Sequence, residues 1–179
     1  DEVEDLERRL KEVVDRSRRL DEELKRRDKK SVEDVRRKLE EVRKKLEDVA
    51  RKLADLLRQG RDAKRVLDEI ERVVRDVERV LEEILRDVKR SIDEVREVAK
   101  ASLKLTEEVI RRVRKVAKER GVPLEKLERD VARAREENDR TLKEISKHSE
   151  KVLREVADMA RKLRKEVKRI EDEIRERAR

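Results

Sequence analysis

The chain of 179 residues contains no Cys, Phe, Tyr or Trp, and only two Gly and one Pro. Without cysteine there is no disulfide framework and no thiolate nucleophile. Without aromatic side chains there is no platform on which nucleic-acid bases could stack. No apolar run approaches the roughly 18 residues of a membrane span, and no signal-peptide core is present. These absences predict a soluble protein without a targeting signal, suited to a cytoplasm-like compartment and without a membrane partner.

Charge dominates what remains, because 58% of the residues are charged and only 34% are apolar. This composition is typical of coiled coils and long helices. The 56 basic and 48 acidic residues give a net charge of +8, and the two signs alternate along the chain, for example over residues 40–45. Such mixing predicts a solvated helix surface with i,i+4 ion pairs. A nucleic-acid partner is not expected, because it would need basic residues gathered on one face.

The two glycines divide the chain into three segments of nearly equal length. Gly60 and Gly121 suit the left-handed position that ends a helix, and Asp62 is a suitable N-cap for the next one. Pro123 is tolerated at the first helical position, where its missing N–H loses no bond. We therefore expect helices at about 1–59, 62–120 and 123–179, each of about 58 residues and about 87 Å. Connections this short make neighbouring helices antiparallel, so residues 1–179 should form one elongated all-α, up-down-up three-helix coiled-coil bundle.

The middle segment carries the most regular apolar pattern. Apolar or small residues follow one another in alternating steps of four and three, which is the a/d seam of a left-handed coiled coil. Flanking apolar residues, such as Ile92 and Ala99, widen the stripe and indicate more than one partner helix. The seam consists of Ala63, Leu67, Ile70, Val74, Val77, Leu81, Ile84, Val88, Ser91, Val95, Val98, Ser102, Leu105 and Val109.

The first segment has a phase slip between Leu24 and Val35. One explanation is a stutter within a continuous helix, which relaxes the supercoil locally. The other is a break at residues 28–31, with Ser31 as the N-cap of a new helix. The break would give a four-helix chain and leave the apolar stripe of residues 90–153 uncovered, so that the chain would form a homodimer or heterodimer. The pattern alone leaves both alternatives open.

Polar residues interrupt the apolar stripe at two levels. Facing residues should have numbers that add up to about 121 across the first turn and about 243 across the second. An unpaired buried hydroxyl or amide costs about 1–3 kcal/mol, whereas a satisfied network fixes the register of the helices. A single Ser is explained more simply by a bond to its own i−4 carbonyl, but the group around Asn138 predicts a network. The first layer comprises Ser17, Ser102, Thr106, Asn138 and Thr141, and the second Ser31, Ser91, His148 and Ser149.

Catalysis and metal binding find little support in the pattern. His148 is the only histidine, and Ser149 is its immediate neighbour. Residues at i,i+1 do not face each other on a helix, so they do not make a nucleophile and base. One His without Cys leaves only carboxylates as metal ligands, and no phosphate- or calcium-binding motif is present. We therefore expect no enzyme activity, no cofactor and no small-molecule substrate.

The chain resembles computationally designed helical bundles over its whole length. The resemblance lies in the missing aromatics, the glycine-only breaks, the Asp62 cap, the charged surface and the near-equal segments, and not in a family motif. Ser17, Ser102, Asn138 and Thr141 look like the buried hydrogen-bond networks of that class. The resemblance implies a monomeric structural scaffold without a natural biochemical function. The alternatives are an interaction module that pairs through residues 90–153 and a natural cytoskeletal-type rod, although such rods usually keep aromatics and less regular patterns.

Overall fold

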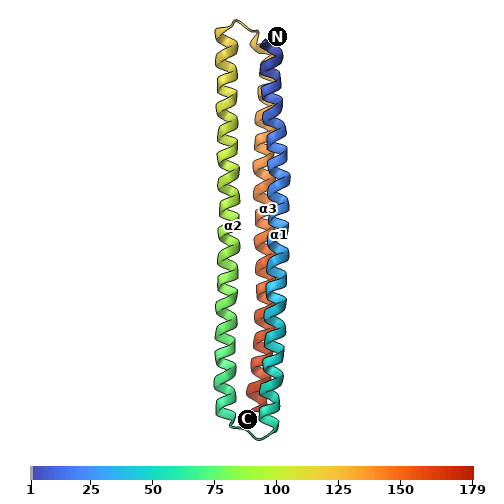
Figure 1. The fold of residues 1–179 in the computed structure, drawn as a ribbon, viewed down its shortest axis with the longest axis vertical. Helices are drawn as coiled ribbons and strands as arrows, with labels where there is room; N and C mark the ends of the chain where they lie inside the picture. Colours follow the sequence, from blue (N-terminus) through green and yellow to red (C-terminus); the bar gives the residue numbers. More distant parts are fainter. Residues whose placement is uncertain (1) are drawn as a thin grey trace. The chain divides into compact units, whose positions relative to one another are not determined.

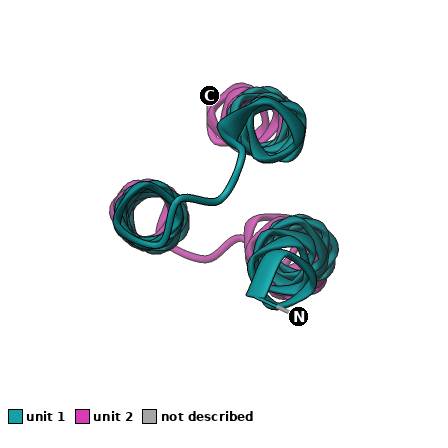
Figure 2. Ribbon diagram, turned by 90° about the horizontal axis from the view of Figure 1, so that it is seen from above, with its two compact units in different colours: residues 1–29, 91–151 teal, residues 30–90, 152–179 magenta. Residues whose placement is uncertain are grey.

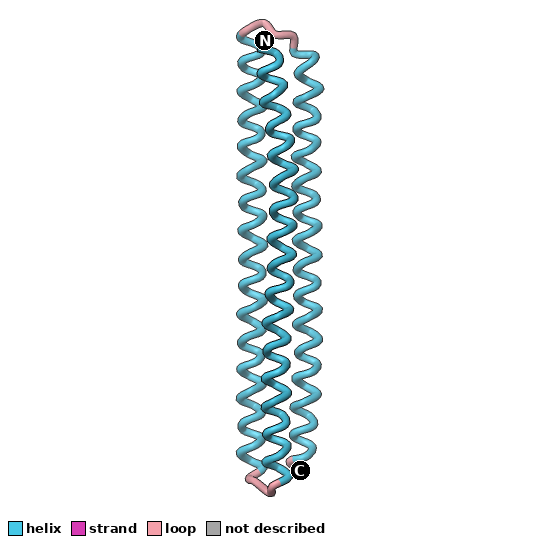
Figure 3. Tube along the Cα trace, turned by 45° about the vertical axis from the view of Figure 1, so that its right-hand side comes forward, coloured by secondary structure: helices cyan, strands magenta, loops and turns pink. Residues whose placement is uncertain are grey.

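The computed structural model describes residues 2–179, which form three long helices (Figure 1). Helix α1 spans Glu2–Arg58, α2 spans Ala63–Glu119 and α3 spans Leu124–Arg177. Over the described range there is no strand, and loops connect the helices at the two glycine turns (Figure 3). The predicted three-helix, all-α fold is confirmed. None of these helices has a stretch apolar enough, over a sufficient length, to cross a bilayer.

Helix α1 is continuous through residues 28–31, so the alternative of a four-helix chain is wrong. Its buried stripe passes from Leu24 to Asp28 and Val32 before it reaches Val35. Two consecutive steps of four make a stutter, which keeps the stripe on one face of an unbroken helix. The sequence suggested a break because the apolar phase slips between Leu24 and Val35 and because Ser31 suits an N-cap.

Both turns end their helices with the same hydrogen-bond motif. Gly60 has a φ of 73° and Gly121 a φ of 67°, the left-handed conformation that glycine adopts without a Cβ penalty. The N–H of Gly60 donates to the carbonyl of Leu57, and that of Arg61 to the carbonyl of Leu56. The equivalent donors at Gly121 and Val122 repeat the pattern. This is the Schellman motif, which satisfies the last carbonyls of α1 and α2.

The start of α2 is capped as the sequence predicted. The carboxylate of Asp62 accepts a hydrogen bond from the backbone N–H of Lys64 at 3.0 Å. This contact satisfies one of the N–H groups that the first turn leaves without a helical partner. Pro123 lies one residue before α3, where its missing N–H again costs nothing.

The chain divides into two compact units, and each helix contributes a segment to both (Figure 2). Unit 1 comprises residues 1–29 and 91–151, and unit 2 comprises residues 30–90 and 152–179. In unit 1, α1 and α3 run parallel, because Arg18 pairs with Glu137 and Lys25 with Glu144. Helix α2 runs antiparallel to α1, because Glu94 pairs with Arg27 whereas Arg120, further along α2, pairs with Glu2 near the start of α1. Unit 1 is therefore an up-down-up three-helix arrangement.

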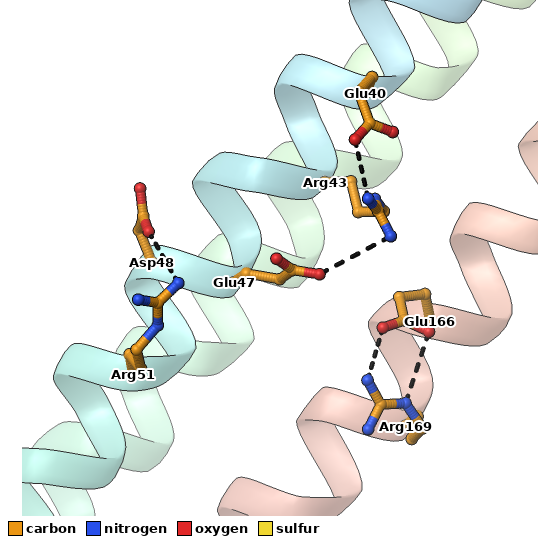
Figure 4. A network of polar contacts seen from close by, with 7 residues as sticks. All are labelled: Glu40, Arg43, Glu47, Asp48, Arg51, Glu166 and Arg169. Atoms are coloured by element: carbon orange, nitrogen blue, oxygen red, sulfur yellow. Dashed lines mark hydrogen bonds and ion pairs between the residues drawn. The ribbon is translucent and has the colours of Figure 1, made fainter.

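Unit 2 has an apolar core with charged residues outside it. Leu39, Leu46, Leu81, Val156 and Ile170 are among its buried side chains. Ion pairs within single helices cover its surface (Figure 4). There Arg43 lies between Glu40 and Glu47, at 2.8 Å and 3.9 Å, and Asp48 pairs with Arg51 and Glu166 with Arg169. Exposed pairs of this kind each contribute only a few tenths of a kcal/mol.

In unit 1 the predicted heptad seam of α2 is correct at Val95, which is fully buried, and wrong at two other positions. Val98 and Leu105 are 47% and 56% exposed, whereas the flanking residues Ile92 and Ala99 are buried. The buried stripe takes two consecutive steps of four, from Ile84 to Val88 and from Val88 to Ile92. This stutter rotates the buried face away from the strict seven-residue repeat, so Val98 and Leu105 lie outside the core.

A buried polar layer as the candidate functional site

The buried polar side chains of the described chain all lie in unit 1. They are Ser17, Asp28, Thr106, Asn138, Thr141 and Ser149. Several of them separate two apolar clusters of that unit. One cluster contains Leu10, Val13 and Ile110, and the other contains Leu24, Val95 and Ile145. The core of unit 1 is therefore interrupted by a polar layer.

The central contact of this layer joins α1 to α3. The hydroxyl of Ser17 donates a hydrogen bond to the side-chain oxygen of Asn138 at 2.8 Å, and both residues are buried. The amide nitrogen of Asn138 is also buried and has no hydrogen-bond partner among the described residues. Sliding one helix along the other would separate Ser17 from Asn138 and bury both groups against apolar neighbours, at a cost of about 1–3 kcal/mol for each unpaired group. The contact therefore favours one register.

The α2 members of the predicted first layer behave differently. The hydroxyl of Thr106 donates to the backbone carbonyl of Ser102, four residues earlier, at 3.2 Å. This is the local bond that a lone Ser or Thr makes on its own helix, and it carries no information about the neighbouring helices. Ser102 is only half-buried. Thr141 is buried and follows Asn138 by three residues on α3. The cross-helix contact of this layer is thus the pair Ser17–Asn138.

The second level centres on a residue that the sequence reasoning missed. Asp28 has a side chain only 4% exposed, and its carboxylate lies 3.1 Å from the Nδ1 atom of His148, whose side chain is 28% exposed. A buried carboxylate needs a hydrogen-bonding or charged partner, and His148 supplies one from α3. Asp28 could have been found from its position, because it lies four residues after Leu24 and four before Val32.

The predicted serines of the second level differ in burial and belong to two units. Ser149 is fully buried, and its hydroxyl has no hydrogen-bond partner within residues 2–179. Ser91 is half-buried in unit 1, and Ser31 is half-buried in unit 2. Within unit 1, this level contains the cross-helix contact between Asp28 and His148 and a buried serine next to His148 in the sequence.

Ion pairs repeat every seven residues beside this layer, where α1 meets α3. Arg18 contacts Glu137 at 3.1 Å, and Lys25 contacts Glu144 at 3.0 Å. Lys25 also contacts Asp21 of its own helix at 3.1 Å. The pKa of Lys25 is raised, most strongly by its hydrogen bond to Glu144 and next by its hydrogen bond to Asp21. The hydrogen bond from Lys25 in turn lowers the pKa of Glu144. These pairs specify the same register as Ser17–Asn138.

The family models, the curated proteins and the solved structures compared with the chain contain no match to it. The properties of the site must therefore be argued from its own residues.

The interactions of this layer are hydrogen bonds between helices. No group of three or more His, Cys, Asp or Glu side chains suited to a metal ion occurs within residues 2–179. Its contacts are a hydroxyl–amide pair and a carboxylate–imidazole pair, each linking α1 to α3. Such pairs are satisfied in one alignment of the helices and unsatisfied in others. The arrangement can therefore select an alignment of α1 and α3.

Proposed function

We propose that the chain is a designed structural scaffold without a catalytic role, in which buried polar contacts fix the register of its helices. The observation that carries the proposal is the 2.8 Å hydrogen bond between Ser17 and Asn138, buried between two apolar clusters of unit 1. Buried polar contacts of this kind specify alignment at some cost in stability. The helices of 57, 57 and 54 residues and the identical glycine turns support the design interpretation.

A pair of engineered cysteines can test the register directly, because the chain has no cysteine of its own. Arg18→Cys with Glu137→Cys joins positions that face each other in the observed register. Arg18→Cys with Glu144→Cys joins positions that would meet only after a slip of one heptad, since Glu144 faces Lys25. We expect rapid oxidation to a disulfide only for the first pair in the otherwise unchanged chain.

The same pairs are then placed in a chain whose polar contact has been replaced by Ser17→Ala and Asn138→Leu. We expect the free energy of unfolding to stay equal or to rise by about 1–3 kcal/mol, because an unpaired buried amide is removed. At the same time, cross-linking of the slipped pair should become at least several times faster. Unchanged cross-linking rates in both backgrounds would contradict a role of Ser17 and Asn138 in setting the register.

A further inference from the structure

The imidazole of His148 has one nitrogen at a buried contact and one that solvent can reach. Its Nδ1 atom lies 3.1 Å from a carboxylate oxygen of Asp28. The side chain of Asp28 is 4% exposed, whereas that of His148 is 28% exposed. The Nε2 atom of His148 is not one of the buried polar atoms without a partner in residues 2–179. Nε2 is therefore the ring nitrogen that can react with a molecule from solution.

The contact with Asp28 also decides which ring nitrogen carries the proton. An ionised carboxylate only accepts hydrogen bonds, so the neutral imidazole must donate its N–H from Nδ1, and Nε2 keeps its lone pair. Turning the ring would leave the buried carboxylate without this hydrogen bond, which is unfavourable. Asp28 therefore fixes both the proton position and the orientation of the ring.

The charged neighbours of His148 on α3 do not compete with it as nucleophiles. Glu144, one turn earlier, is engaged by Lys25 of α1 at 3.0 Å. Lys147 and Lys151 are exposed. The ammonium group of a lysine has no lone pair, whereas the neutral imidazole has one on Nε2. An electrophile that reaches this surface should therefore react first at His148.

We propose that Nε2 of His148 is an acylation site for activated esters, with Asp28 as its positioning residue. The Nε2 lone pair forms a bond to the acyl carbon, and the alkoxide or phenolate group leaves with its electron pair. The ring becomes an acylimidazolium, and the Asp28 carboxylate stabilises the new positive charge through the hydrogen bond from Nδ1. Water then attacks the acyl carbon, which releases the carboxylic acid and one proton and restores the neutral ring. This reactivity goes beyond the scaffold function and does not involve Ser17 or Asn138.

The ester p-nitrophenyl acetate tests the proposal, because the released p-nitrophenolate is followed by its absorbance. His148→Gln removes the nucleophile and gives the background rate of the other side chains. The matched control adds Lys147→His to that variant and so places an imidazole at an exposed position of the same helix. After subtraction of the background, His148 should react about tenfold faster than the imidazole introduced at position 147, because only His148 has a buried carboxylate partner. Equal rates would overturn the proposal.

The variant Asp28→Asn separates positioning from folding. An amide can present either its oxygen or its nitrogen to Nδ1, so the proton position is no longer fixed. This variant should lose the advantage of about tenfold while its circular dichroism stays unchanged. Nitrogen magnetic resonance of the imidazole should show the proton on Nδ1 in the unchanged chain and a shift toward Nε2 in Asp28→Asn. A neutral ring with its proton on Nε2 in the unchanged chain would overturn the proposal, whether or not the variant folds.

Discussion

Asp28 is a charged residue in the apolar stripe of α1, and its partner in the structure comes from another helix. Its carboxylate occupies a position in the apolar stripe of α1, and a helix with a purely apolar stripe would place Leu or Val there. Its partner His148 comes from α3 and is more exposed than Asp28. When one partner of a buried pair is removed, the other is left without compensation, which usually costs more than the pair itself contributes.

The two members of this pair should therefore respond differently to substitution. His148→Ala leaves the Asp28 carboxylate buried without the imidazole and should lower the free energy of unfolding by about 1–3 kcal/mol. Asp28→Leu removes the buried charge and fills the apolar stripe, so stability should be unchanged or higher. Urea unfolding at neutral pH, followed by circular dichroism, gives both values. If Asp28→Leu were the more destabilising variant, the pair would be contributing net stability.

At the scale of the helices, a small number of residues was enough to predict the helix boundaries. Glycines at 60 and 121 and the Asp62 cap predicted the four helix ends beside the turns, at residues 59, 62, 120 and 123, and the structure has them at 58, 63, 119 and 124. These signals are local, because they depend on the conformation of one residue or on one side chain near the chain's own N–H groups. The same glycine and cap residues also predicted that the chain has three helices.

The buried faces were harder to predict. The strict heptad of α2 led to Val98 and Leu105 as core residues, whereas the stutter brings Ile92 and Ala99 into the core. The apolar stripe of α2 is wide enough to allow both choices. Which part of a wide stripe is buried depends on the phase of all three helices together, and a single segment does not contain that information.

The glycine turns lead to a prediction for the connections between helices. Gly60→Ala and Gly121→Ala should each lower the free energy of unfolding by about 1–2 kcal/mol, because both residues have a positive φ. A Cβ at either position would meet no atom within 4 Å, so the cost is one of backbone conformation alone. Asparagine tolerates this conformation better, and Gly60→Asn is the matched control. Thermal unfolding should rank the glycine first, asparagine second and alanine third, and equal values for asparagine and alanine would contradict the explanation.

At the scale of the whole molecule, the two units differ in the chemistry of their cores. The buried polar side chains are in unit 1, and two of them, Asn138 and Ser149, retain a buried polar atom without a partner. Each such atom reduces stability by about 1–3 kcal/mol, so unit 1 should open more readily than unit 2.

Hydrogen exchange along α2 measures this difference within one helix. Amides at residues 77–88, in unit 2, should exchange at least about tenfold more slowly than those at residues 95–106, in unit 1. The substitutions Ser17→Ala and Asn138→Leu should reduce the difference. Equal protection of the two stretches in the unchanged chain would show that the helices open as one cooperative body.

The charged surface predicts how stability depends on pH. Hydrogen bonds from Arg43, Lys25 and Arg169 lower the pKa values of Glu40, Glu144 and Glu166, respectively. A carboxylate whose pKa is lower in the folded state contributes stability above its unfolded pKa of about 4.3 and loses it as the pH falls through the folded value. The melting temperature should therefore decrease as the pH is lowered below about 4.3. Replacing all three glutamates by Gln should make the acidic part of the profile flatter, and an unchanged profile would assign the acid sensitivity to other groups.

The contact between Asp28 and His148 also provides a spectroscopic probe of unit 1. The chain has a single histidine and no Phe, Tyr or Trp, so the aromatic side-chain signals in its proton magnetic resonance spectrum come from one imidazole alone. That ring lies 3.1 Å from a buried carboxylate, between α1 and α3. Its chemical shifts therefore report on the packing of these two helices without any isotope label or attached dye.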